Sequence, residues 1–293
     1  MFFSLFKKIN SWLFGKNLGR VPGARKLHSF LYNILKPKGE IAVNVNGFKM
    51  FLNSSDKGEV KDILLRGVYD KLETDIVQSG VGEGSTALDI GAHIGYFTLI
   101  LAKSVGESGK VFAFEPENKN FSMLKKNIEV NKFKNVILEN IALSSSSGKV
   151  NLFLDKDNLG NMSFSPENIP DSSLNGKVEV ESQTLDDYAK NISGKISFIK
   201  MDVQGAEGLV LRGGLELLKN HKPVILMEFW PYGLKNNGTD PLELLRMLNS
   251  LGYKFFVLDV KNQLLKEKRP EDIMNVSANR EGGKGWANIL CKI

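Results

Sequence analysis

The stretch LDIGAHIGYF, residues 88–97, joins an apolar run to a segment with helical spacing. Asp89 lies at the end of the apolar run, and Gly91 and Gly95 follow it. Glycine adopts positive φ angles without strain, so these two residues allow a tight turn and a close approach of the backbone to a ligand. The N-terminus of the helix that follows favours such binding. We therefore predict a strand, a ligand-binding loop and a helix, in that order.

The same alternation continues along most of the chain. The apolar runs TALDI, VFAFE, NVILEN, ISFIKMDV, PVILMEF, KFFVLDV and ANILCKI are typical of strands, and segments with helical spacing separate most of them. Alternation of this kind indicates parallel strands covered by helices on both faces. The predicted fold class is therefore α/β, with a doubly wound, Rossmann-like sheet that binds ligands at the carboxyl ends of its strands.

Two segments depart from the alternation. Residues 144–182 contain short strand-like pieces and predict a β insertion, or lid, over the ligand-binding edge. Near the N-terminus, IAVNVNGFKMFLN (41–53) contains the Asn46-Gly47 pair that is typical of a β-hairpin, and helical spacing follows over 59–79. We predict a basic helical arm with a hairpin over residues 1–57 and the α/β domain over residues 58–293.

Positive charge is concentrated in the N-terminal arm. Residues 1–39 hold eight Lys and Arg and no acidic residue, which leaves 31 of the 39 basic residues against all 33 Asp and Glu. A nucleic-acid groove on the main domain would need a basic face there, so we predict no nucleic-acid partner. Residues 1–15 have amphipathic helical spacing but are too short and too charged to span a bilayer. They pack on the body or on a second subunit of a homo-oligomer, or they lie peripherally on an anionic membrane.

The cysteine and histidine content limits the compartment and the metal chemistry. Cys291 is the only cysteine, which excludes an internal disulfide and fits a reducing, cytoplasmic environment. The three histidines are scattered without a second ligand at metal-binding spacing, so no histidine-based metal site is predicted.

An acidic residue on the second strand indicates the cofactor. Glu115 lies 26 positions after Asp89 and is placed to accept hydrogen bonds from the ribose hydroxyls of a nucleoside. The loop reads GAHIG and lacks the middle glycine on which a dinucleotide pyrophosphate would rest. Asp89 would repel pyrophosphate but attract an ammonium or sulfonium cation. The sequence therefore favours S-adenosylmethionine (SAM) over NAD.

Three more residues are candidates for cofactor binding. His93 either forms a hydrogen bond with the backbone of its loop or takes part in catalysis. Asn140 and Ala142 follow the third strand, where the adenine should lie. Asn140 either meets the adenine amino group or satisfies the turn.

Three carboxylates lie at the ends of the fourth and fifth strands, or just beyond. Asp202 contacts SAM or the substrate, or it caps the following helix. Glu207 is either catalytic or simply favoured by the helix dipole. Glu228 ends an apolar strand, where an unpaired charge would be costly, so a role in the site is favoured. The three could also bind a divalent cation, although no spacing rule supports a metal.

The motifs LDIGAHIGYFT, VFAFEPE, ENIALS, FIKMDVQGAEGLVLRGG and PVILMEF resemble, in order, those of the FkbM-type SAM-dependent methyltransferases. The resemblance covers about residues 60–290. It implies a seven-stranded sheet with the last strand antiparallel, and O-methylation of sugars or secondary metabolites. Carried over by position, Asp89, Gly91 and Gly95 would hold the methionine part, Glu115 the ribose, and Asp202 would lie beside the methyl group. The usual acid of the K-x-D-V-E-G-x-E motif is here Gln204, which puts substrate choice in doubt rather than SAM binding.

The leading function is therefore a SAM-dependent O-methyltransferase acting on a hydroxyl of a sugar, a glycan or a secondary metabolite. No Asn/Asp-Pro-Pro-Tyr/Phe stretch follows the fourth strand, which favours an oxygen acceptor over a nitrogen. Phe229, Trp230 and Tyr232 form either a platform for a sugar ring or part of the core. The alternatives are an NAD-linked oxidoreductase and a membrane-associated module without catalytic activity.

Overall fold

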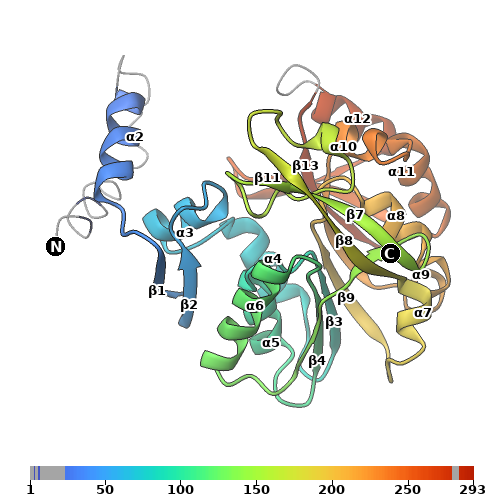
Figure 1. The fold of residues 1–293 in the computed structure, drawn as a ribbon. Coiled ribbons are helices and arrows are strands. Elements are labelled where there is room, and N and C mark those ends of the chain that lie inside the picture. The colour runs from blue at the N-terminus through green and yellow to red at the C-terminus, as the bar shows by residue number, and fades with distance from the viewer. Residues whose placement is uncertain (1–2, 4–5, 7–23, 279–283) are drawn as a thin grey trace. The chain divides into compact units, whose positions relative to one another are not determined.

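The structure is a computed structural model that describes Phe3, Phe6 and residues 24–278 and 284–293. The chain divides into two compact units, Met1–Tyr69 and Asp70–Ile293 (Figure 1).

The first unit contains helix α2 (Ala24–Leu35), the strands β1 (Glu40–Val45) and β2 (Phe48–Asn53), and helix α3 (Glu59–Arg66). The two strands pair in antiparallel fashion, which confirms the predicted hairpin. Asn46 and Gly47 both have positive φ angles, 51° and 85°, as the tight turn of a two-residue hairpin loop requires. Apart from Phe3 and Phe6, the predicted amphipathic helix over 1–15 lies outside the described residues.

The helical spacing at 59–79 belongs to two helices, α3 and α4 (Lys71–Gly80), rather than to one. Gly67 ends α3 in the left-handed conformation, with φ 73°, and its N–H donates to the carbonyl of Ile63. Asp70 then starts α4, because its carboxylate accepts a hydrogen bond from the N–H of Glu73. The apolar spacing runs through this break, which is why the sequence pattern alone does not reveal it.

The second unit is built on a mixed sheet of eight strands in the order β12-β11-β13-β10-β9-β3-β4-β5, counted over the described residues. The strands are β3 (Thr86–Ile90), β4 (Lys110–Phe114), β5 (Val136–Glu139), β9 (Ile196–Met201), β10 (Val224–Phe229), β11 (Lys254–Asp259), β12 (Leu264–Lys268) and β13 (Ala287–Lys292). The predicted doubly wound α/β class is confirmed, and the last strand, β13, is antiparallel to both of its neighbours. The strand count differs by one, because β12 adds an exposed edge that carries no apolar run.

Helices flank this sheet (Figure 1). They are α5 (Tyr96–Ser104), α6 (Asn118–Val130), α7 (Leu185–Ala189), α8 (Glu207–Arg212), α9 (Leu215–His221), α10 (Pro231–Asn236), α11 (Pro241–Ser250) and α12 (Pro270–Ala278). All five residues of β3 are buried, as expected of a strand covered on both faces. No helix among the described residues is both long and apolar enough to cross a bilayer.

The helical segment after β9 is interrupted at Gly213 and Gly214, which separate α8 from α9. A Cβ atom at Gly213 would overlap the carbonyl oxygen of Ser144, and one at Gly214 would lie 2.7 Å from Leu185 Cδ2. The two glycines therefore let neighbouring segments approach the backbone closely, and the helix breaks at this contact.

The predicted β insertion is a separate sheet of three strands in the order β6-β8-β7. Its strands are β6 (Ala142–Ser144), β7 (Gly148–Asp155) and β8 (Leu174–Thr184), with the short 3-10 helix η2 (Pro166–Asn168) between the last two. The insertion supplies residues to a cleft at the carboxyl ends of β3, β4 and β9.

Candidate active site

A cleft of about 560 Å³, partly open to solvent, lies at the carboxyl ends of β3, β4 and β9. The chain leaves β3 toward β4 on one side, while β9 lies against the other side of β3, so this is the topological switch point where such sheets bind ligands. From the edge of the main sheet the lining includes Ile90, Gly91, His93, Phe114, Glu115, Ile141, Asp202, Val203 and Gln204, and from the insertion it includes Ala142, Leu152, Leu159, Gly160, Met162 and Phe164.

The loop after β3 is shaped by its two glycines. Gly91 has φ 81° and Gly95 has φ 92°, so both adopt the left-handed conformation. A Cβ at Gly91 would overlap the carbonyl oxygen of Asp202, and one at Gly95 would lie 2.7 Å from Leu124 Cδ1. The close approach predicted at these glycines is therefore made by the protein itself, and it brings the loop against the end of β9.

Glu115 lies at the cleft wall at the end of β4, as predicted. Its carboxylate accepts hydrogen bonds from the N–H groups of His93 and Glu117, both at 2.9 Å. Burial raises the pKa of Glu115 to about 7, although His93 and these two N–H donors favour the charged form. An ionised carboxylate has about four acceptor positions, so two remain for hydroxyl groups in the cleft. His93, held by this contact, has a positive φ of 48° and lines the same wall.

Asn140 and Ala142 differ in whether they reach the cleft. The side-chain amide of Asn140 donates to the carbonyls of Glu115 and Pro116, at 2.9 and 3.1 Å. Asn140 therefore fixes the turn after β4, and it is Ala142, with its neighbour Ile141, that lines the cleft. The cleft wall is apolar at these two positions.

Asp89 does not line the cleft. It is 2% exposed, and its carboxylate accepts a 2.5 Å hydrogen bond from the hydroxyl of Thr98 on α5. The backbone of Asp89 pairs with β9 at Lys200. The Asp89 carboxylate therefore contacts Thr98 near the start of α5 and is not part of the cleft lining.

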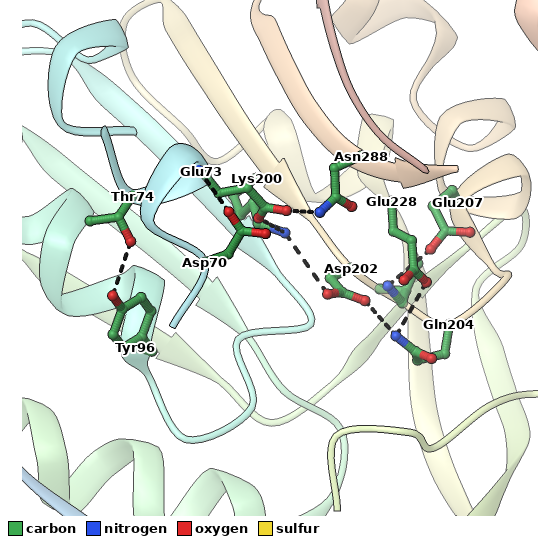
Figure 2. Close-up of polar contacts among 11 residues, drawn as sticks. Asp70, Glu73, Thr74, Tyr96, Lys200, Asp202, Gln204, Glu207, Glu228 and Asn288 are labelled. Atoms are coloured by element: carbon green, nitrogen blue, oxygen red, sulfur yellow. Dashed lines mark hydrogen bonds and ion pairs between the residues drawn. The ribbon is translucent and has the colours of Figure 1, made fainter. Parts of the chain in front are cut away.

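A buried lysine organises the carboxylates at the end of β9 (Figure 2). Lys200 is 2% exposed, and its Nζ lies 3.4 Å from Glu73 Oε2 and 3.9 Å from Asp202 Oδ2. Burial alone would lower the pKa of Lys200, but Glu73 and Asp202 outweigh it and raise that pKa, so the ammonium stays charged. Asn288 on β13 donates to the other oxygen of Glu73.

Sequence reasoning missed Glu73, Lys200 and Asn288. One signal was available: Lys200 interrupts the apolar run ISFIKM, and a buried ammonium requires a carboxylate partner. Nothing in the sequence identifies Glu73 as that partner, because it comes from α4, far away in the chain.

Gln204 connects two of the predicted acids. Its Nε2 donates to Asp202 Oδ1 at 2.6 Å and to Glu228 Oε2 at 3.3 Å (Figure 2). Burial, together with Asp202 and Glu207, raises the pKa of Glu228 well above its usual range. An amide can donate to both carboxylates at once, whereas the glutamate usual in the motif could donate to only one of them, and only when protonated. Gln204 therefore holds Asp202 without needing a proton.

The backbone of Gln204 also anchors the insertion. The Gln204 carbonyl accepts hydrogen bonds from the Ser163 hydroxyl at 2.8 Å and from the Asn168 side-chain amide at 3.1 Å. The same amide reaches the carbonyl of Gly233 on α10 at 3.3 Å. These contacts fasten the insertion to the end of β9.

Glu207 forms hydrogen bonds with the backbone of the loop after β9. It is fully buried at the first position of α8, and its Oε1 accepts from the N–H groups of Val203 at 3.1 Å and Gly205 at 3.4 Å. Its Oε2 is buried without a hydrogen-bond partner among the described residues. Burial, with a smaller contribution from Asp202, raises the pKa of Glu207 to about 7. Of the three predicted acids, only Asp202, whose side chain is 34% exposed, lines the cleft.

The raised pKa of Glu207 predicts a pH-dependent stability. Between the usual value of 4.5 and about 7, the folded protein holds a proton that the unfolded chain releases, so the free energy of unfolding falls as the pH rises through this window. Glu207→Gln removes this dependence. We expect the loss of stability from pH 5 to pH 8, measured by urea unfolding, to be smaller by on the order of 2–3 kcal/mol in the variant. The exposed Glu216→Gln serves as the control, and equal pH slopes for wild type and Glu207→Gln would contradict the prediction.

The aromatic residues at the end of β10 and just beyond it are not part of the cleft lining. Phe229 is fully buried in the core. The Trp230 indole donates to the carbonyl of Lys284 at 2.8 Å, and its ring lies 5.8 Å from that of Tyr232. In the part of the chain that the structure describes, no group of three His, Cys, Asp or Glu has an arrangement that could hold a metal ion.

Comparison with known proteins identifies the family. The model of the methyltransferase FkbM domain matches residues 89–255, more than half of the chain. No curated protein matches the chain.

Solved structures are similar at low identity. A methyltransferase FkbM from Methylobacillus flagellatus is 14% identical, with a TM-score of 0.42 over 79% of this chain and 52% of that one. A SAM-dependent O-methyltransferase from Thermotoga maritima is 14% identical, with a TM-score of 0.41 over 90% and 81%. A SAM-dependent methyltransferase from Aquifex aeolicus is 18% identical, with a TM-score of 0.39 over 76% and 89%. These similarities are too low to bear on the substrate.

The family match agrees with the resemblance carried by the sequence motifs and with the position of the cleft at the switch point of the sheet. Because the FkbM model spans more than half of the chain, the protein belongs to the FkbM family of methyltransferases, and its cofactor is S-adenosylmethionine.

Proposed function

We propose that the protein is an O-methyltransferase that acts on a hydroxyl group of a sugar, a glycan or a secondary metabolite. The observation that carries this proposal is the position of Asp202. Its carboxylate lines the cleft, forms an ion pair with Lys200 and accepts a hydrogen bond from Gln204. A hydroxyl acceptor must lose a proton during methyl transfer, and a carboxylate held at the cleft can accept it.

The residues of the cleft fit SAM. Glu115 offers its remaining acceptor positions to the ribose hydroxyls, and the apolar wall at Ile141 and Ala142 suits the adenine. The loop from Gly91 to His93 and the Asp202 carboxylate would face the cationic methionine part. When bound, SAM supplies an electrophilic methyl group on a positively charged sulfur. We propose that Asp89, Gly95 and Asn140 contribute by shaping this wall, because their side chains or backbone contact protein groups instead.

Asp202 is the acid proposed to contact the acceptor. Glu228 acts through Gln204, which donates to both carboxylates, and Glu207 acts through the backbone of the 203–205 loop. Both are therefore positioning residues. A well-oriented nucleophile can gain about 7–11 kcal/mol over a free one, so holding Asp202 and the acceptor in place is a large part of the work.

The insertion is proposed to select the acceptor. Met162 and Phe164 line the cleft together with Asp202, and their segment is fastened to Gln204. The proposed methyltransferase domain spans residues 58–293, with residues 1–57 as an appended arm and hairpin.

The proposal can be tested with SAM that carries a ¹³C-labelled methyl group. The full-length protein is incubated with this SAM and a panel of sugars, oligosaccharides and hydroxylated metabolites, and the products are analysed by NMR. We expect the label on oxygen, because O-methyl carbons resonate apart from N- and C-methyl carbons. Label on nitrogen or carbon would contradict O-methylation.

Cofactor binding is measured separately by calorimetry with S-adenosylhomocysteine and with NAD. We expect binding of the first and not of the second. Binding of NAD alone would contradict the proposed function and favour an NAD-linked oxidoreductase.

A further inference from the structure

Helix α2 has an apolar face that the described residues of the first unit leave exposed. Leu27, Phe30 and Ile34 are 58%, 61% and 59% exposed. Their spacing of three and four residues places them in one stripe along the helix. Large apolar side chains scattered singly over a surface are ordinary, but three in one stripe indicate an interaction site.

The other apolar side of α2 already has a partner within the first unit. Tyr32 is buried there with Phe6 and Leu65, and Leu31 and Leu35 pack against them. Folding of this unit therefore uses one side of the helix and leaves the stripe exposed.

The surroundings of the stripe are basic. Lys26 on α2 and Lys38 after the helix are exposed, and Arg25 is the neighbour of Lys26 in sequence. Lys36 belongs to the packed side instead, because its Nζ donates to the carbonyl of Ser54 at 2.8 Å and lies 5.5 Å from the centre of the Tyr32 ring. No acidic residue occurs before Glu40. Exposed apolar residues together with Lys and Arg are typical of a helix that lies in the interface of an anionic membrane.

We propose that the Leu27–Phe30–Ile34 stripe of α2 docks on an anionic lipid surface. At 12 residues, α2 is about 18 Å long, so it would lie in the plane of the interface rather than cross it. A second copy of the chain is the poorer occupant, because pairing two such faces would bring like charges together.

This contact differs from the one expected of residues 1–15. Phe6 is 8% exposed and packs against α2, with its ring 5.3 Å from that of His28. Phe3 lies beside it, 6.2 Å from Phe6 and 6.3 Å from Tyr32. These two residues thus serve the interior of the unit, and the lipid-facing stripe is the one on α2. The proposal does not depend on the proposed O-methylation.

Flotation with vesicles tests the proposal on the full-length protein. The vesicles are phosphatidylglycerol with phosphatidylcholine, or phosphatidylcholine alone. We expect binding to the anionic vesicles, weaker binding at high salt, and a loss of about tenfold or more in the triple variant Leu27→Ser, Phe30→Ser, Ile34→Ser. The matched control, Val260→Ser, Leu264→Ser, Leu265→Ser, removes exposed apolar residues of the second unit and should bind like wild type.

A fluorescent probe locates the contact independently of affinity. The native Cys291 is buried, so a cysteine introduced on α2 can be labelled selectively with a polarity-sensitive dye. We expect a blue shift on addition of anionic vesicles for Phe30→Cys and little shift for Ser29→Cys, which lies on the polar side of the helix. Equal shifts at both positions, unchanged flotation of the α2 triple variant, or a dimer in light scattering that the triple variant abolishes would each overturn the proposal.

Discussion

Asp202→Asn is expected to slow methyl transfer by about 10²- to 10⁴-fold, the usual contribution of a positioned proton acceptor. The amide keeps the size of the side chain but cannot take the proton of an acceptor hydroxyl. Because Asp202 is partly exposed at the cleft and is not part of the core, the fold should persist. The rate is measured as kcat with the acceptor identified by the labelled-methyl experiment.

Two measurements separate catalysis from binding. Calorimetry with S-adenosylhomocysteine should show an affinity close to that of wild type, and a loss of that affinity would assign Asp202 to the cofactor instead. Gln204→Leu is the matched control, since it removes the 2.6 Å hydrogen bond to Asp202 but keeps the carboxylate. Its kcat should fall less than that of Asp202→Asn. Equal turnover by Asp202→Asn and wild type would refute the proposed role.

Lys200→Met is expected to lower the free energy of unfolding by about 3–5 kcal/mol, as is usual when one partner of a buried ion pair is removed. The variant leaves Glu73, which is 3% exposed, without its ammonium partner. Burial already raises the pKa of Glu73 to about 7, and removal of Lys200 would raise it further. A carboxyl group whose pKa is raised in the folded state makes the protein less stable as the pH rises. The loss of unfolding free energy in Lys200→Met should therefore be larger at pH 8 than at pH 6.

A double-mutant cycle identifies the cause of this loss. If the cost comes from the uncompensated Glu73 carboxylate, Glu73→Gln should restore part of the stability of Lys200→Met. Urea unfolding at pH 8 of the wild type, both single variants and the double variant gives the coupling energy. Additive losses would show that the Glu73–Lys200 pair is not coupled and that Lys200 matters through packing, including its contact with the Phe97 ring.

The sheet could be predicted because its strands are buried on both faces, which leaves continuous apolar runs such as TALDI. The hairpin at Asn46-Gly47 could be predicted because a two-residue turn demands positive φ at both positions. Strand β12 could not, since an exposed edge strand has no apolar pattern.

The sequence predicts where in the fold the candidate site lies better than it predicts the side-chain contacts within the site. The motif spacing indicates that Glu115 and Asp202 meet at one edge of the sheet, and the structure brings both to the same cleft. The motif spacing does not reveal that the Asp89 carboxylate contacts Thr98 or that Glu73 pairs with Lys200. These contacts depend on how α4 and α5 pack against the sheet, and helical spacing alone does not fix that packing.

The attachment of the insertion to Gln204 has a kinetic consequence. The Gln204 carbonyl accepts hydrogen bonds from Ser163 and Asn168, and the Gln204 side-chain amide donates to Asp202. A substrate that displaces the insertion, and keeps it displaced, would at the same time disturb Asp202, the proposed proton acceptor. Such a molecule could bind and yet turn over slowly. On the proposed function, the enzyme would therefore distinguish its substrates more by kcat than by KM.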